Sequence, residues 1–425
     1  MKKKRVSLNL AIDSESDEPI SRGQFYSLKR KIPFGAEQKK RKAPVAIRKM
    51  FSYSKEEFFN RISLLLIIPV AILLTFGLLM IFNTTAAQII DKSLEVDTHT
   101  ALFKQLLFGG IGVLLGSIAY ALGYENLLRL SRPALIFATL LLALLFVPKV
   151  GQTINGATRW MNVFGFSFQP SEWVKLLIPP TYLHWALKQK EIRFVPFLKI
   201  LGALSIPIIL IFLEPDNGTT AIILFVLFIL FFLTSVPLLY WAVPLALFVG
   251  SAGAVAYQMP YVQGRIQVYL HPELDLKGKG HQPYQAKIAA GAGGLWGRGL
   301  GESLQKLNYL PEARNDYIAA IFAEEMGFIG VLGLIFLYMI FAFGGVCVAN
   351  RAKDLSGCIL AAAFTFLIAI QAFLNLGIVS GLLPSKGMTL PFFSQGGTSL
   401  IVNLVLLFLL LDISRKSNGA LQDGL

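Results

Sequence analysis

Charged side chains are scarce in this chain. Asp, Glu, Lys and Arg make up 15% of its 425 residues, and hydrophobic residues make up 55%. With a mean hydropathy of +0.61, this composition excludes an ordinary soluble domain, in which about a quarter of the residues are charged. The two cysteines, Cys347 and Cys358, are too few for a disulfide framework, and the four histidines stand in no HExxH or CxxC pattern. We therefore expect neither zinc chemistry nor a redox centre.

Ten long apolar runs follow a polar N-terminal segment. They cover roughly residues 62–82, 104–122, 133–147, 172–187, 195–213, 219–235, 236–257, 317–349, 357–383 and 398–412. A helix needs about 20 residues to cross a bilayer, so we predict an all-α polytopic membrane protein with about ten transmembrane helices, the third and fourth on the short side. We expect residues 1–58 to form a basic, mostly disordered cytoplasmic tail, residues 59–414 the transmembrane domain, and residues 415–425 a cytoplasmic C-terminal tail.

The net charge of +14 is unevenly distributed, and much of it precedes the first span. Such clusters indicate the cytoplasmic side and contact with anionic membrane lipids. Nucleic-acid binding is the competing interpretation, and we expect no nucleic acid because no aromatic-interleaved binding domain accompanies the basic tail. With the tail inside, the inner connections carry Arg129, Arg132, Lys188, Lys190, Arg193, Lys199, Arg351, Lys353, Arg415 and Lys416. The outer connections near 83–101 and 384–397 carry almost none, so both termini are expected in the cytoplasm.

A large extracytoplasmic loop, about 258–316, separates spans 7 and 8 and is basic. It contains Arg265 and Arg298 and, at 291–301, the glycine-rich segment GAGGLWGRGLG. Backbone N–H groups next to Lys and Arg make a good site for phosphate oxygens. A flexible loop with solvated charges explains the same features, and the sequence leaves both open.

Further polar residues fall on the same outer side. Arg159 and Trp160 fit an interfacial cation with an aromatic anchor, and Glu172 and Lys175 lie three apart on one helix face, where a simple ion pair is the alternative. The turn EPDNG at 214–218 is expected on the same side, and an Asx-type turn is the structural alternative to a role in the site. The segment at 384–399, broken by Pro and paired Gly, is expected to line a cavity, because broken backbone at membrane depth needs protein or water around it.

Three acids belong to the start of the eighth span. Asp316 stands where a helix start accepts a side-chain cap, which is its plain structural interpretation. Glu324 and Glu325 lie further along an otherwise apolar helix, where acids are costly enough to indicate function or a firm structural role.

Together the motifs GATRW, QPSEWVK, EPDNGT, GRGLGESLQKLNYLPE, NDYIAAIFAEEMG and LPSKGMTLPFFSQGGTSL resemble the SEDS family of FtsW, RodA and SpoVE over residues 62–414. The match looks closest to division-type FtsW, because of SLQKLNYLPEA, the lysine of LPSKG and the long basic tail. NDY stands where TDF is usual, and SQGGTS where SYGGSS is usual. The family's catalytic acid falls on Asp316 in this resemblance.

The resemblance implies a peptidoglycan glycosyltransferase of the bacterial cytoplasmic (inner) membrane that extends a nascent glycan strand from lipid II. Its implied partners are a class B penicillin-binding protein and other divisome proteins. Asp316 would act as general base, and the residues expected to bind substrate are Arg159, Glu172, Lys175, Arg265, Arg298, Lys386 and Ser394. No cofactor is certain, although Mg²⁺ or Mn²⁺ bridging the diphosphate fits the chemistry. A flippase for the lipid-linked precursor, or a scaffold without activity, remains the alternative.

Overall fold

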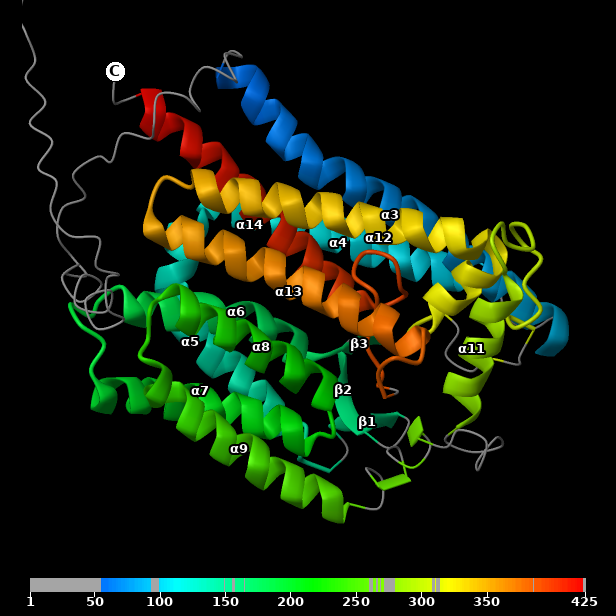
Figure 1. Ribbon diagram of the computed structural model, residues 1–425, viewed down its shortest axis with the longest axis horizontal. Coiled ribbons are helices and arrows are strands. Elements are labelled where there is room, and N and C mark those ends of the chain that lie inside the picture. The colour runs from blue at the N-terminus through cyan, green and yellow to red at the C-terminus, as the bar shows by residue number, and fades with distance from the viewer. Residues whose placement is uncertain are drawn as a thin grey trace, which may run out of the picture.

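The computed structural model describes residues 55–92, 99–148, 150–154, 157–163, 165–259, 263–264, 267, 269–270, 280–307, 310, 314–384 and 386–422. Most of the predicted tail and Arg265 lie outside these residues. Each of the ten apolar runs forms a helix, and these helices lie side by side along the long axis of the molecule (Figure 1). They are α3 (Lys55–Lys92), α4 (Thr100–Leu122), α5 (Tyr124–Leu144), α6 (Pro170–Ala186), α7 (Phe194–Leu213), α8 (Asn217–Leu233), α9 (Leu238–Gln258), α12 (Ile318–Arg351), α13 (Leu355–Val379) and α14 (Gly397–Gln422).

Seven of the helices in the described residues are long and apolar enough to cross a membrane, and Asn217–Leu233 and Leu238–Leu247 are shorter apolar helices. The multi-pass helical fold is thus as expected. The short fourth span is confirmed, since α6 has 17 residues. The short third span is wrong, because α5 begins at Tyr124 and runs through Pro133 for 21 residues. The apolar run marked only the part of the helix that follows its last charged residue, Arg132.

The core of the bundle lies around its C-terminal helices. In α14, 83% of the most apolar window is buried within the protein and in α13 61%, whereas in α4 only 17% is. α4 approaches α14 closely through Gly112 and Gly116, where an added Cβ would meet the side chains of Leu404 and Phe408. Small residues of this kind allow membrane helices to pack backbone to backbone. Because α13 and α14 are largely enclosed by other helices, the loop that connects them begins and ends at well-packed positions.

Two features of the connections between these helices are not transmembrane helices. Strands β1 (Gly151–Ile154), β2 (Ala157–Val163) and β3 (Phe166–Phe168) form an antiparallel sheet in the order β1-β2-β3, with Gln152 opposite Trp160 and Met161 opposite Phe168. The basic loop contains helix α11 (His281–Ala292). Both lie at one end of the bundle, whereas α3 begins and α14 ends at the other (Figure 1).

Candidate active site

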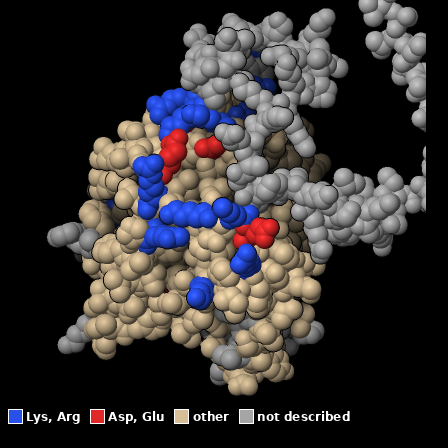
Figure 2. Space-filling model, turned by 90° about the vertical axis from the view of Figure 1, so that its left-hand side faces the viewer, with Lys and Arg blue, Asp and Glu red and all other residues tan. Residues whose placement is uncertain are grey.

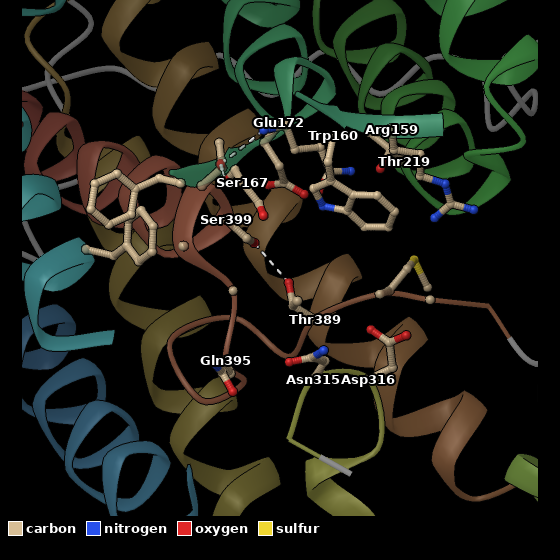
Figure 3. Close-up of a pocket in the computed structure, with 18 of the residues that line it drawn as sticks. Arg159, Trp160, Ser167, Glu172, Thr219, Asn315, Asp316, Thr389, Gln395 and Ser399 are labelled. Carbon is tan, nitrogen blue, oxygen red and sulfur yellow. Dashed lines mark hydrogen bonds between the residues drawn. The ribbon is translucent and has the colours of Figure 1, made fainter. Parts of the chain in front are cut away.

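A cavity of about 390 Å³ lies at the end of the bundle that carries the sheet. Its walls come from β2 and β3, the first turns of α4, α6, α8 and α14, the turn before α12, one residue of α13 and the segment 387–389 (Figure 3). Its polar lining residues are Lys104, Gln105, Arg159, Ser167, Gln169, Glu172, Thr219, Asn315, Asp316, Gln371, Thr389, Gln395, Thr398 and Ser399. The expectation that 384–399 lines a cavity is confirmed for residues 387–389 and 395–399.

Asp316 lies in the turn before α12 and is half-buried. The N-cap position of α12 is occupied by Tyr317, one residue after Asp316, and the side chain of Tyr317 makes no capping hydrogen bond. Its carboxylate lines the cavity beside Asn315 (Figure 3). A Cβ added to Gly387 would lie 2.9 Å from Oδ2 of Asp316 and 3.8 Å from Nη1 of Arg159. The backbone of Gly387 therefore leaves room for an acid and a cation to face the same small space.

Arg159 is held in place by the turn between α7 and α8. Its Nη2 donates to the carbonyl of Pro215 at 2.6 Å, and Nη1 lies 3.5 Å from Oδ1 of Asp216. Its guanidinium carbon is 5.9 Å from the ring centre of Trp160. Asp216 also accepts the backbone N–H of Thr219, so it caps α8 as the Asx interpretation predicted. The same carboxylate thus begins a helix and orients an arginine, which lies mostly buried.

A buried ion pair stands behind the cavity wall. Nζ of Lys175 donates to Oε2 of Glu172 at 2.6 Å and to Oε1 of Gln371 at 2.8 Å. Gln371 in turn donates from its amide nitrogen to the carbonyl of Thr389 at 2.9 Å. The Thr389 hydroxyl oxygen lies 2.9 Å from the hydroxyl oxygen of Ser399. Lys175 itself does not line the cavity, whereas Glu172 and Gln371 do. The ion pair between Glu172 and Lys175, which the sequence left as the alternative, is present, and the lysine holds lining groups in position.

Glu214 is a second buried acid near Arg159. It lies just beyond the end of α7, and neither of its carboxylate oxygens has a hydrogen-bond partner among the described residues. Burial raises the pKa of this carboxyl from 4.5 to about 8, with the nearby charge of Asp216 adding to the rise and Arg159 opposing it. At neutral pH this carboxyl is therefore mainly protonated.

Of the other residues expected to bind substrate, none lines this cavity among those described. Ser394 closes the turn after Leu390, whose backbone N–H its hydroxyl accepts at 2.8 Å. Lys386 directly precedes Gly387 and is half-buried. Arg298 pairs with Oε1 of Glu324 at 3.1 Å. Substrate contact by these residues, and by Arg265, stays a prediction.

The glycine-rich segment packs against α12. The backbone N–H groups of Arg298 and Gly299 donate to the carbonyls of Glu324 and Glu325, both at 3.0 Å. A Cβ at Gly297 would collide with the carbonyl of Glu325, and α12 bends at Gly327, which has φ of +65°. Glycine here permits close backbone approach, and the N–H groups of residues 298 and 299 are already occupied by protein carbonyls.

Glu324 and Glu325 fasten this loop to the helix. Glu324 accepts from the Ser303 hydroxyl and from the backbone N–H of Leu304. Glu325 lies 3.1 Å from Nζ of Lys306 and accepts from Asn83 of α3 at 2.7 Å. The cost of two buried acids is offset by these bonds, and their role is to hold the loop.

Several lining side chains were not predicted from the sequence, above all Gln371, Thr389 and Ser399. One available signal was the pair Gln371 and Asn375, two amides four residues apart in the otherwise apolar stretch 366–379. Within the described residues no group of three or more His, Cys, Asp or Glu side chains is placed to hold a metal ion.

The family model described as "Cell cycle protein", which covers FtsW, RodA and SpoVE, matches residues 63–419. The chain is 37% identical over 362 residues to stage V sporulation protein E of Bacillus subtilis, covering 83% of this chain and 97% of that protein. It is 38% identical over 367 residues to a probable peptidoglycan glycosyltransferase FtsW of Thioalkalivibrio sp., covering 84% and 90%.

Two solved structures are also similar. One, described as "Structural coordination of polymerization and crosslinking by a peptidoglycan synthase complex", contains a chain with a TM-score of 0.66 and 28% identity, with 83% of this chain and 97% of that chain covered. The other is the rod shape determining protein RodA of Thermus thermophilus, with a TM-score of 0.60, 27% identity and coverage of 82% and 95%.

Proposed function

Because the chain belongs to the FtsW/RodA/SpoVE family, we propose that it is a peptidoglycan glycosyltransferase, which polymerises lipid II into glycan strands at the outer face of the cytoplasmic membrane during cell division. The observation that carries this proposal is the cavity in which the carboxylate of Asp316 and the guanidinium of Arg159 face the same space beside Gly387. The names of the relatives support the reaction class, and the geometry supports the roles that we assign to these two residues.

The orientation follows from the distribution of charge. Figure 2 shows the end of the molecule opposite the sheet, where Lys and Arg side chains gather and few acids lie among them. The helix ends there carry Arg129, Arg132, Lys188, Lys190, Arg193, Lys199, Lys353, Arg415 and Lys416. Positive charge marks the cytoplasmic side of membrane proteins, so the cavity at the other end faces outward, with both helical termini inside.

The reaction needs a proton acceptor and a cation. An attacking sugar hydroxyl gives its proton to the carboxylate of Asp316 while its oxygen bonds to the anomeric carbon of the donor sugar, and the bond from that carbon to the diphosphate breaks. General bases typically contribute about 10²–10⁴-fold to rate. The negative charge that builds on the departing diphosphate is stabilised by Arg159, whose mostly buried guanidinium is held in place by Pro215 and Asp216.

The remaining lining residues fit a saccharide. Trp160 presents an aromatic surface to the cavity, and Asn315, Thr389 and Ser399 offer amide and hydroxyl groups (Figure 3). Neutral groups of this kind orient sugar hydroxyls without competing for protons. Glu172 lines the same wall but is neutralised by Lys175, so we assign this pair to shaping the cavity.

A divalent cation is a proposed helper. No three His, Cys, Asp or Glu side chains gather within the described residues, so the phosphates of the substrate would have to supply most of the oxygen ligands of Mg²⁺ or Mn²⁺, with Asp316 as a carboxylate available in the cavity. Rates measured after chelation and after addition of each ion test this, and an unchanged rate in chelator excludes a metal requirement.

We also propose a class B penicillin-binding protein as partner. Support comes from the related chain in a peptidoglycan synthase complex that coordinates polymerisation and crosslinking. Co-purification of such a protein with this chain, and faster polymerisation in its presence, are the expected results.

The test of the function is polymerisation of lipid II in detergent by the purified protein with its partner. Asp316→Asn should bind lipid II and make no glycan. Asp354→Asn is the matched control, because Asp354 caps α13 at the other end of the bundle and Asn caps nearly as well. Normal glycan yield from Asp316→Asn would exclude the base role. Lipid II movement across vesicles without any polymer, or division supported by Asp316→Asn, would favour the flippase or the scaffold.

A further inference from the structure

Asn375 is a polar side chain buried inside α13. Only 1% of its surface is exposed, and the helix around it is apolar. An amide in such surroundings costs free energy unless it is hydrogen-bonded. Asn375 does not line the cavity, so its bonds must serve the protein itself.

The amide of Asn375 joins two segments that lack regular structure. Its Nδ2 donates to the carbonyl of Asp316 at 3.0 Å and to that of Met388 at 2.6 Å. Both neighbours are acceptors, so the nitrogen must point to them, since an oxygen in its place would face two carbonyl oxygens. The amide orientation is thereby fixed, and both hydrogens are used.

These two backbone segments form the place where the proposed base lies. Asp316 precedes α12, and Met388 follows Gly387, at which an added Cβ would lie 2.9 Å from Oδ2 of Asp316. Separating the carbonyls of residues 316 and 388 would move the carboxylate relative to Gly387 and Arg159. One side chain therefore sets the spacing between the base and the wall opposite it.

Gln371 repeats the arrangement one turn earlier. It donates to the carbonyl of Thr389, the residue after Met388, and it accepts from Lys175. Two amides on one face of α13 thus hold two consecutive residues of the loop. The loop is therefore anchored to α13, which together with α14 has the largest buried share among the candidate membrane spans in the described residues.

We propose that Asn375 is a positioning residue, which fixes the backbone of Asp316 to that of Met388 so that the carboxylate meets substrate in the reactive geometry. This inference deepens the proposed function and rests on it for its kinetic consequence. Catalytic groups need placement within about 0.5 Å, and only a donor of two hydrogen bonds can hold both carbonyls from this site.

The first test is independent of activity. Asn375→Leu keeps the number and branching of the side-chain heavy atoms and removes both donors, and Asn375→Ala removes them without adding bulk. Hydrogen exchange of the full-length protein in detergent should show backbone amides in 314–317 and 386–390 exchanging about 10-fold faster in both variants, as expected for the loss of one or two hydrogen bonds. Tyr182→Phe is the control, because it removes a buried bond to Thr234 remote from the cavity.

The second test is kinetic. In lipid II polymerisation, kcat of both Asn375 variants should fall about 10- to 100-fold while KM stays within about threefold, because the lining residues remain. Unchanged exchange in both segments overturns the inference, as does a rise in KM that accounts for the whole loss, or an equal loss in Tyr182→Phe. A wild-type protein that makes no glycan overturns the proposed function instead, and hydrogen exchange still decides whether Asn375 holds the two segments.

Discussion

Gly387→Ala is the most direct test of the active-site geometry. The new Cβ would lie 2.9 Å from Oδ2 of Asp316, whereas ordinary contacts begin near 3.4 Å, and it would lie at an ordinary 3.8 Å from Arg159. The carboxylate must therefore retreat by about 0.5 Å. Since a misplacement of about 1 Å can cost roughly 100-fold in rate, we expect about a 10-fold loss of kcat.

Stability should not fall with activity in this variant. Gly387 does not have positive φ, so alanine can adopt its backbone conformation. Replacing glycine where the conformation permits it typically stabilises by about 0.4–1 kcal/mol through the unfolded chain. A melting temperature equal to or above that of the wild type, together with the lower kcat, would distinguish displacement of the carboxylate from misfolding.

The assay is the initial rate of glycan formation from labelled lipid II with the partner present. Gly202→Ala in α7 is the matched control, because its Cβ meets nothing within 4 Å and its rate should equal that of the wild type. If Gly387→Ala polymerises at the wild-type rate while Asp316→Asn is inactive, the carboxylate does not act from the position described, and the reasoning fails.

Two further predictions concern buried charge. Lys175→Met leaves the buried carboxylate of Glu172 without its cation and should lower the free energy of unfolding by about 3–5 kcal/mol, seen as a lower melting temperature. The double variant Lys175→Met with Glu172→Gln should recover most of this stability. An equal loss in the single and the double variant would contradict the prediction. The pKa of Glu214 is about 8 in the folded protein and 4.5 in the unfolded chain, so the folded state holds this proton more tightly. Its contribution to stability is therefore fully present below pH 4.5 and is lost as pH rises through about 8. Glu214→Gln should therefore gain melting temperature relative to the wild type between about pH 5 and 9, and a pH-independent difference would argue against a buried proton there.

The glycine-rich segment illustrates where a local pattern is ambiguous. Glycines next to Arg298 are compatible with a phosphate site, and equally with backbone packed against backbone. The sequence cannot separate these, because both need the same residue for the same steric reason. The kink at Gly327 and the bonds from Arg298 and Gly299 to α12 show that packing prevails here.

The sequence by itself determined the membrane class, the ten helices, the basic face and the acid at the start of α12, because hydrophobic length, charge bias and motifs are local properties of the chain. Only the tertiary structure decided which polar residues meet. Lys175 reaches Gln371 nearly two hundred positions away, and Asn375 joins Asp316 to Met388. Ser394 is used within its own loop. Such contacts depend on the mutual packing of α6, α12 and α13, which arises from the summed burial of many apolar side chains and is not encoded in any one motif.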